Sequence, residues 1–348
     1  LYNGAPKEDK MFKSVGLVNK LPDGQVETGS VGPLKYLSTI QDSEIVRYPK
    51  DAVAKFDHDG DHVKVFVPEV TAGADLMVPG QYFKTKTKMG KLNFISLMLA
   101  LFFGTASLPH VLIRYYTVPS QRDARKSTIV AIGGIGFFYV LTLFIGFGAM
   151  TLGVIDVESG NMSAPLLAKA FGIFLFSIIS AIAFATVLGT VSGLIVATSG
   201  AIAHDLMDNY MGIQMNDKQK VMAGKIAAFA VGIVAIILGI AFKGMNVAFL
   251  VGWAFAVAAS ANLPSIIMLL FWKKTTAKGI AWSIGVGMVS ALGIILTSPK
   301  MFTQFGIDGA APHALNNPGI ISIPLSFITL VVASLMTQKD NEGLEDIR

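Results

Sequence analysis

Beyond residue 90 the sequence is dominated by apolar runs of about 20 residues, which as an α-helix span a hydrocarbon core of roughly 30 Å. Short polar stretches separate the runs, and the third run is longer than a bilayer requires, which predicts a tilted or projecting helix. The pattern predicts an all-α polytopic membrane protein with seven spans, at residues 92–117, 128–153, 172–203, 221–242, 246–271, 279–297 and 319–337.

Polar residues gather at the two ends of the chain. Residues 1–89 are rich in charge and in turn signals, and HVKVFVPEV at 62–70 alternates as a strand does. We expect this segment to be a polar head with minor β content, followed by a helical bundle over 90–337 and a tail over 338–348. Within the bundle, residues 161–171 predict a short surface helix capped by Ser163, with Pro165 in its first turn.

Composition and charge agree with a membrane protein. Hydrophobic residues make up 53% of the chain and charged residues 15%, against roughly 25% charged in soluble domains. The loops at 114–127, 205–225 and 273–278 hold ten Lys and Arg residues, whereas the opposite loops hold three. Because positively charged loops stay on the cytoplasmic side, we expect the head outside and the C-terminus in the cytoplasm. The membrane is expected to be the cell (inner) membrane. The net charge of +5 is a topology signal and does not indicate nucleic-acid binding.

Two classes of chemistry find no support in the chain. It contains no cysteine, which excludes disulfides and thiolate metal sites within it. The spans carry no paired carboxylates and no metal-ligand helix, so we expect neither an enzyme nor a cofactor.

The first apolar run is interrupted by FGTASLPH at 103–110 in a way that favours a binding site. Gly104 loosens the backbone, and Pro109 removes a donor. At membrane depth such a break survives where it is buried by protein or lines a cavity, and it offers carbonyls to a cation and amides to an anion. The alternative is a proline kink packed against neighbours. His110 is either a neutral, hydrogen-bonded side chain or part of a proton path.

The third run, AIAFATVLGTVSGLIVATSGAIAHDL at 181–206, carries two overlapping patterns. Thr186 and Thr190 lie four residues apart on one helical face beside Gly189, so a hydroxyl and the carbonyl one turn back offer two oxygens to a small ion. The alternative is that both hydroxyls bond back to their own helix. Small residues also recur at positions that let two helices approach closely, namely Gly189, Gly193, Ala197 and Gly200.

Three consecutive stretches resemble the sodium:solute symporter family, and within it the cation/acetate symporter (acetate permease) branch. They are FGTASLPHVLIRYYTVPSQRDARKS, AFATVLGTVSGLIVATSGAIAHDLM and VGWAFAVAASANLPSIIMLLFWKKTT, within a match from residue 90 to about 298. The resemblance implies the second half of a leucine-transporter-like inverted-repeat fold, in which 92–117 is the discontinuous first helix of the second repeat. We therefore expect the chain to be the C-terminal part of a longer protein, whose N-terminal repeat is its partner.

The same resemblance assigns sites. Sodium is expected at the Thr186 carbonyl and the Thr190 side chain beside Gly189, with the other ligands on the missing repeat. Some relatives have two adjacent hydroxyls where this chain has Gly189 and Thr190, which puts the coordination number or the ion in question. The substrate, a small carboxylate such as acetate, is expected at the break. The break residues assigned to it are Gly104, Thr105, Ser107 and His110.

The expected function is sodium-coupled symport of a small monocarboxylate by alternating access across the lipid bilayer. Arg114 and Asp205, the latter next to His204, are candidates for an inner gate, although a solvated pair at a helix end is the simpler reading of His204 and Asp205. The alternatives are a channel or a ligand sensor with an extracytoplasmic head, and a proton-coupled or other-solute symporter of the same family.

Overall fold

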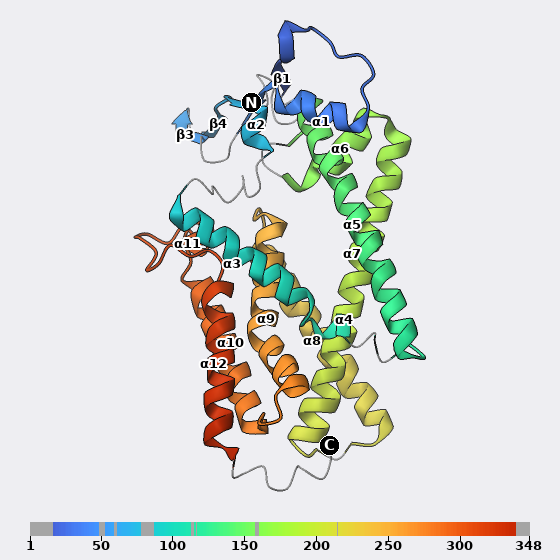
Figure 1. The fold of residues 1–348 in the computed structure, drawn as a ribbon, viewed down its shortest axis with the longest axis vertical. Helices are drawn as coiled ribbons and strands as arrows, with labels where there is room; N and C mark the ends of the chain where they lie inside the picture. Colours follow the sequence, from blue (N-terminus) through green and yellow to red (C-terminus); the bar gives the residue numbers. More distant parts are fainter. Residues whose placement is uncertain are drawn as a thin grey trace. The chain divides into compact units, whose positions relative to one another are not determined.

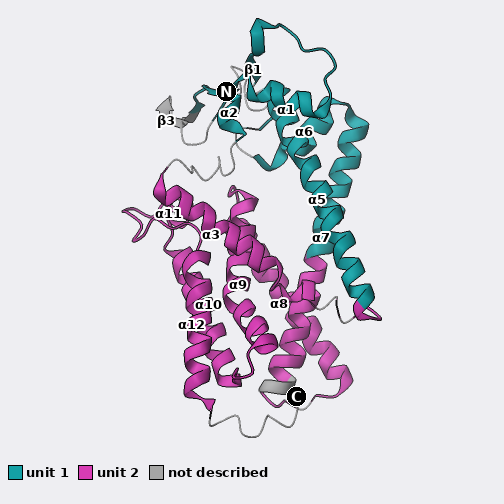
Figure 2. Cartoon of the chain, in the orientation of Figure 1, with its two compact units in different colours: residues 1–81, 122–190 teal, residues 82–121, 191–348 magenta. Residues whose placement is uncertain are grey.

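The chain forms two compact units in the computed structural model, which describes residues 17–48, 53–58, 61–77, 87–112, 115, 117–156, 160–213 and 215–338. Figure 1 shows the elements of each unit, and Figure 2 colours the units separately. The first unit comprises residues 1–81 and 122–190, and the second comprises residues 82–121 and 191–348. The first unit groups the polar head with the second apolar helix and most of the third. The predicted boundary at residue 89 stays a prediction.

The polar head is a small α/β assembly with its own core. Its antiparallel sheet has the order β1–β2–β5, and β3 and β4 form a separate hairpin. Ile40 and Ile45 are its buried apolar side chains. The elements are β1 (Leu17–Lys20), η2 (Pro22–Gly24), α1 (Pro33–Gln41), β2 (Glu44–Arg47), β3 (Val53–His58), β4 (Asp61–Phe66), β5 (Glu69–Ala72) and α2 (Gly73–Leu76).

The strand expected over 62–70 is divided in two. β4 ends at Phe66 and β5 begins at Glu69, and the two belong to different sheets. Pro68 lies between them and cannot donate to a ladder, which accounts for the division.

The head is joined to the far end of α5 (Gln121–Thr151) within the first unit. The Tyr36 hydroxyl lies 3.1 Å from the Thr151 hydroxyl, and the Tyr36 ring lies 6.2 Å from the Phe144 ring. One amphipathic side chain therefore links the polar segment to an apolar helix.

The short helix predicted near residue 163 is present as α6 (Ser163–Ala170), preceded by η6 (Gly160–Met162). The prediction that Ser163 caps it is wrong. Met162 occupies the cap position, and the Ser163 hydroxyl instead donates to the Gly160 carbonyl at 2.9 Å. The 3-10 turn η6 directly precedes the helix, so Ser163 is the first helical residue and not the cap.

Seven described helices are long and apolar enough to span a membrane, which confirms the predicted number and positions. The first span combines α3 (Lys88–Thr105) with α4 (Pro109–Leu112), and the third combines α7 (Ile173–Gly200) with the π-helical turn η7 (Ala201–Tyr210). The others are α5, α8 (Asp217–Ala241), α9 (Val247–Phe271), α10 (Ala277–Leu296) and α12 (Gly319–Met336), with the short α11 (Pro299–Phe305) between the last two.

Helix starts in the second unit are set by local chemistry. A polar side chain accepts a hydrogen bond from an amide of the first turn, which satisfies a donor that the helix itself cannot pair. In α8 the Asn216 and Gln219 side chains form a reciprocal capping box. The capping residues are Thr87, Asn216, Asn246, Thr276 and Ser298, for α3, α8, α9, α10 and α11.

The core of the second unit is held together by small and hydroxylated residues. Ser283 of α10 and Ser326 of α12 lie 2.8 Å apart, and Ser260 of α9 lies 2.6 Å from Ser322 of α12. These four serines are fully buried. Without water between apolar helices, such interhelical hydrogen bonds and close contacts are what hold the helices in place.

Close helix approach occurs on α10 rather than at the glycines of α7. A Cβ at Gly287 would lie 2.1 Å from the Ser260 carbonyl oxygen, whereas Cβ atoms at Gly189, Gly193 and Gly200 would meet nothing within 4 Å in the described chain. Pro264 has no amide to pair with the Ser260 carbonyl four residues earlier. That carbonyl is directed at α10, so a glycine is needed there.

We predict that Gly287→Ala lowers the free energy of unfolding by about 1–3 kcal/mol, because the added methyl forces α9 and α10 apart. Gly285→Ala on the same helix is the matched control, since its Cβ would meet nothing within 4 Å. Thermal denaturation of the complete protein in detergent measures both. Equal melting temperatures for the two variants would contradict the packing described.

Candidate functional site

The interruption of the first span lies where the sequence predicts it. α3 ends at Thr105 and α4 begins at Pro109, and residues 106–108 are not helical. The chain turns as the Ser107 amide donates to the Gly104 carbonyl at 3.0 Å, and the helix restarts with amides that donate to the Leu108 carbonyl. The helix is therefore broken at this point, and whether the break binds a ligand or is a proline kink packed against neighbours stays open.

Helix α9 packs closely against the interruption. A Cβ at Gly104 would lie 2.6 Å from both the Cβ and the carbonyl oxygen of Phe255, so the two backbones touch. Further along α9, the Asn262 side-chain amide donates to the Ser107 carbonyl at 3.1 Å. Gly104 thus permits the close approach of α3 and α9. The sequence pattern predicts a different role for this glycine, the loosening of the backbone.

The interruption leaves peptide groups of both kinds without partners. In the described chain the carbonyls of Thr105 and Ala106, and the amides of Leu108 and His110, make no hydrogen bond. Thr105 and Ala106 are exposed, and Leu108 and His110 are half-buried. Carbonyl oxygens suit a cation and amides at the start of a helix suit an anion, so the segment carries donors and acceptors for both.

The side chains predicted to bind substrate divide into two groups. The Ser107 hydroxyl is buried and donates its single proton to the carbonyls of Phe103 and Gly104, at 2.9 and 3.1 Å. In this structure it caps α3, and its expected role toward a carboxylate stays a prediction. The Thr105 hydroxyl donates to the Leu101 carbonyl at 2.7 Å but is exposed, so it remains accessible to a ligand.

The residues predicted to bind sodium lie together on an exposed face of α7. The Thr190 hydroxyl oxygen is 3.0 Å from the Thr186 carbonyl oxygen, and a Cβ at Gly189 would meet nothing within 4 Å. The hydroxyl bonds back to its own helix, as the alternative interpretation expects, and that bond brings two oxygens side by side. These residues belong to the first unit and the interrupted helix to the second.

The gating residues are described in part. In η7 the His204 Nδ1 and Asp205 Oδ1 atoms are 3.0 Å apart, with side chains 63% and 73% exposed. This is the solvated pair that the simpler interpretation expects. Arg114, the proposed partner, lies outside the described residues.

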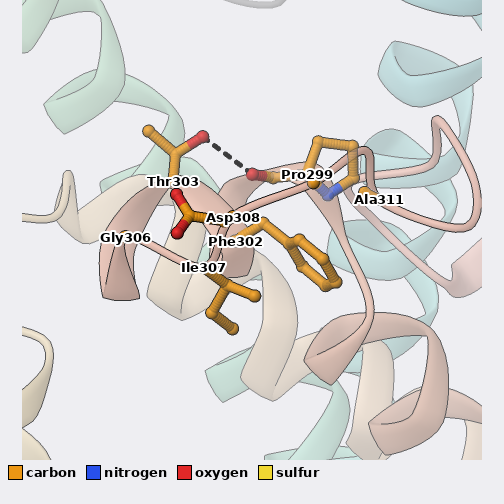
Figure 3. Close-up of a pocket in the computed structure, with 8 residues that line it drawn as sticks. Pro299, Phe302, Thr303, Gly306, Ile307, Asp308 and Ala311 are labelled. Carbon is orange, nitrogen blue, oxygen red and sulfur yellow. Dashed lines mark hydrogen bonds between the residues drawn. The ribbon is translucent and has the colours of Figure 1, made fainter.

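A shallow recess of about 340 Å³ lies at the end of α11, shown in Figure 3. Its lining includes Asp308 as its only charged residue, and Thr303, whose hydroxyl donates to the Pro299 carbonyl at 2.9 Å. None of the predicted site residues lines it.

The site also involves residues that the sequence analysis does not assign. Asn262 contacts the break from 155 residues away. Asn93 and Ser96 of α3 bind the backbone of the loop before α12, through Ala314, Asn316 and Asn317. Helical spacing does not reveal such partners, because they depend on which helices pack together.

Seven apolar helices, one of them interrupted by residues with unpaired peptide groups, define a polytopic membrane protein of the transporter class. Comparison with known proteins supplies the family. Residues 62–287 match the sodium:solute symporter family, and the chain belongs to that family, whose members are transporters and not enzymes. This confirms the family resemblance seen in the sequence.

Two curated relatives carry further information. The chain is 45% identical over 266 residues to "Uncharacterized symporter YwcA" of Bacillus subtilis, covering 74% of this chain and 51% of the relative. It is 44% identical over 278 residues to "Monocarboxylic acid transporter" of Corynebacterium glutamicum, covering 76% of this chain and 50% of the relative. The chain thus spans about half the length of both relatives.

We predict that Ser107→Ala lowers the free energy of unfolding by about 1 kcal/mol, because the carbonyls at the end of α3 lose a donor in a buried setting. Ser177→Ala, which removes an exposed hydroxyl bonded to the Ile173 carbonyl on α7, is the control and changes stability by less than about 0.5 kcal/mol. Thermal denaturation compares them. A Ser107 variant as stable as the control would show that the hydroxyl does not cap the helix.

Proposed function

We propose that the complete protein is a secondary active transporter that couples sodium entry to uptake of a small monocarboxylate such as acetate. The observation that carries the proposal is the interrupted helix of a sodium:solute symporter chain, with unpaired carbonyls at Thr105 and Ala106 and unpaired amides at Leu108 and His110. A charged solute that crosses a membrane needs such groups, because hydrocarbon supplies none.

The substrate binds at the interruption. The amides of Leu108 and His110, at the start of the half-helix α4, hold the carboxylate, and the exposed Thr105 side chain lies next to them in the sequence. Gly104 and Ser107 shape the segment. A sugar or an amino acid needs more side-chain partners than these, so a small carboxylate fits the sparse polarity better. The relative named as a monocarboxylic acid transporter supports this class.

Sodium binds at α7, through the Thr186 carbonyl and the Thr190 hydroxyl, with room left by Gly189. Their 3.0 Å separation supports this assignment, since both oxygens can face one ion. The remaining ligands come from an N-terminal repeat outside this chain. Sodium prefers oxygen donors of this kind, so no further cofactor is required.

Transport follows alternating access in an inverted-repeat fold. Sodium binding stabilises the outward-open state, and the substrate is released inward when one group of helices rocks against the other. The protein lies in the inner membrane, with residues 1–89 outside and the C-terminus in the cytoplasm. Asp205, with Arg114, contributes to the inner gate.

The experiment is uptake of radiolabelled acetate by the complete protein in vesicles, with and without a sodium gradient. We expect saturable accumulation above the external concentration only when sodium is higher outside. A channel gives no accumulation, a sensor gives no uptake, and a proton-coupled symporter of the same family accumulates acetate without sodium.

We predict that Thr190→Ala lowers the apparent sodium affinity several-fold, because roughly one oxygen ligand of five is lost. Thr198→Ala is the matched control, since its hydroxyl is also exposed on α7 and donates to the Leu194 carbonyl at 2.8 Å. Sodium titration of initial uptake rates measures both. Identical sodium dependence in the two variants would remove Thr190 from the ion site.

A further inference from the structure

Asn262, on α9, holds the interruption of the first span from a neighbouring helix. Its side-chain amide donates to the Ser107 carbonyl at 3.1 Å. Among the described residues this is the only hydrogen bond that joins residues 105–110 to another element. The remaining bonds of the segment are made within the first span.

The Ser107 carbonyl needs this donor because the interruption removes its helical partner. In a continuous helix it would accept from the Val111 amide, but that amide donates to the Leu108 carbonyl instead, at 3.0 Å. An unpaired carbonyl in a water-poor interior is costly. The Asn262 amide therefore favours the unwound conformation over rewinding into a continuous helix.

The donor sits on a firmly packed part of α9. Two residues before it, Ser260 lies 2.6 Å from the Ser322 hydroxyl, and next to it Leu263 packs with Ile323 of α12. Ser260 and Leu263 are buried, while Asn262 itself is half-buried. A side chain on so rigid an element fixes the position of what it binds.

We propose that Asn262 is a positioning residue of the transporter, which holds residues 106–108 in the conformation whose unpaired amides, at Leu108 and His110, receive the carboxylate. The inference rests on the proposed function and adds a residue of α9 to it. Asn262 acts through Ser107 and makes no contact with the substrate. Loss of its amide donor weakens substrate affinity more than it slows the transport cycle.

The test is Asn262→Asp, which keeps the shape of the side chain and removes the donor when ionised. We expect KM for acetate to rise roughly tenfold or more, with Vmax changed far less, because an ionised carboxylate also repels the Ser107 carbonyl. Protonation gives this aspartate an O–H that can donate to the same carbonyl. The KM ratio of variant to wild type therefore falls once the pH is low enough to protonate this carboxyl.

Two further variants complete the design. Asn246→Asp is the matched control, because Asn246 caps the start of the same helix by accepting from the Ala248 amide at 2.8 Å, and aspartate caps equally well. We expect it to keep the wild-type KM at every pH. Asn262→Ala removes the donor without adding charge, and we expect a raised KM that does not recover at low pH.

The outcomes separate this inference from the function beneath it. A wild-type KM in the folded Asn262→Asp or Asn262→Ala protein, with normal uptake by the unaltered protein, overturns the role of Asn262 alone. A raised KM in Asn262→Asp that persists relative to wild type at a pH low enough to protonate the introduced carboxyl also overturns it, because the missing donor is then not the cause. Absence of saturable uptake by the unaltered protein overturns both proposals.

Discussion

The structure depends on one constraint. Peptide groups inside a membrane protein need hydrogen-bond partners, and the peptide groups of residues 105–110 do not all find partners within this segment. Within the described chain two carbonyls and two amides of this segment make no hydrogen bond. Each such group is costly in a water-poor interior, so the conformation persists only where other parts of the molecule hold it and a polar ligand or water reaches it. Gly104 against Phe255 and Asn262 on Ser107 are the contacts that hold it.

The helices around the interruption form a rigid frame. α9, α10 and α12 meet through buried serines and glycines, and α3 is tied to the loop before α12 by Asn93 and Ser96. By contrast, α5 and α7 keep their most apolar stretches exposed in this chain. In the mechanism that we propose, the frame of the second unit fixes one side of the substrate site.

Much of the fold follows from the sequence, because length and hydrophobicity determine where a chain can cross a membrane. All seven spans and the break at residues 106–108 were predictable from local patterns. Long-range partners were not. Nothing in the sequence connects Asn262 with the break until α9 is placed beside α3, and the Ser163 prediction failed because a 3-10 turn precedes α6.

The site residues show the same limit. Spacing alone puts Thr186 and Thr190 on one face, and the structure brings their oxygens to 3.0 Å. Spacing does not show whether a hydroxyl is already engaged. The Ser107 hydroxyl donates its hydrogen bond to carbonyls of α3, which no pattern in the sequence reveals. The chemistry of the break therefore lies more in its backbone than in its side chains.

The most direct measurement of the central claim is the accessibility of the unwound segment to water. These 348 residues contain no cysteine, so single cysteines can be placed at Ala106, which is exposed in the break, and at Ala100, which is fully buried on the preceding helix α3. Reaction of the complete protein, freed of any other cysteine, with a water-soluble thiol reagent should be fast at position 106 and slow at position 100. Acetate with sodium should slow the reaction at position 106. Equal, slow reaction at both positions in the folded protein would contradict the account.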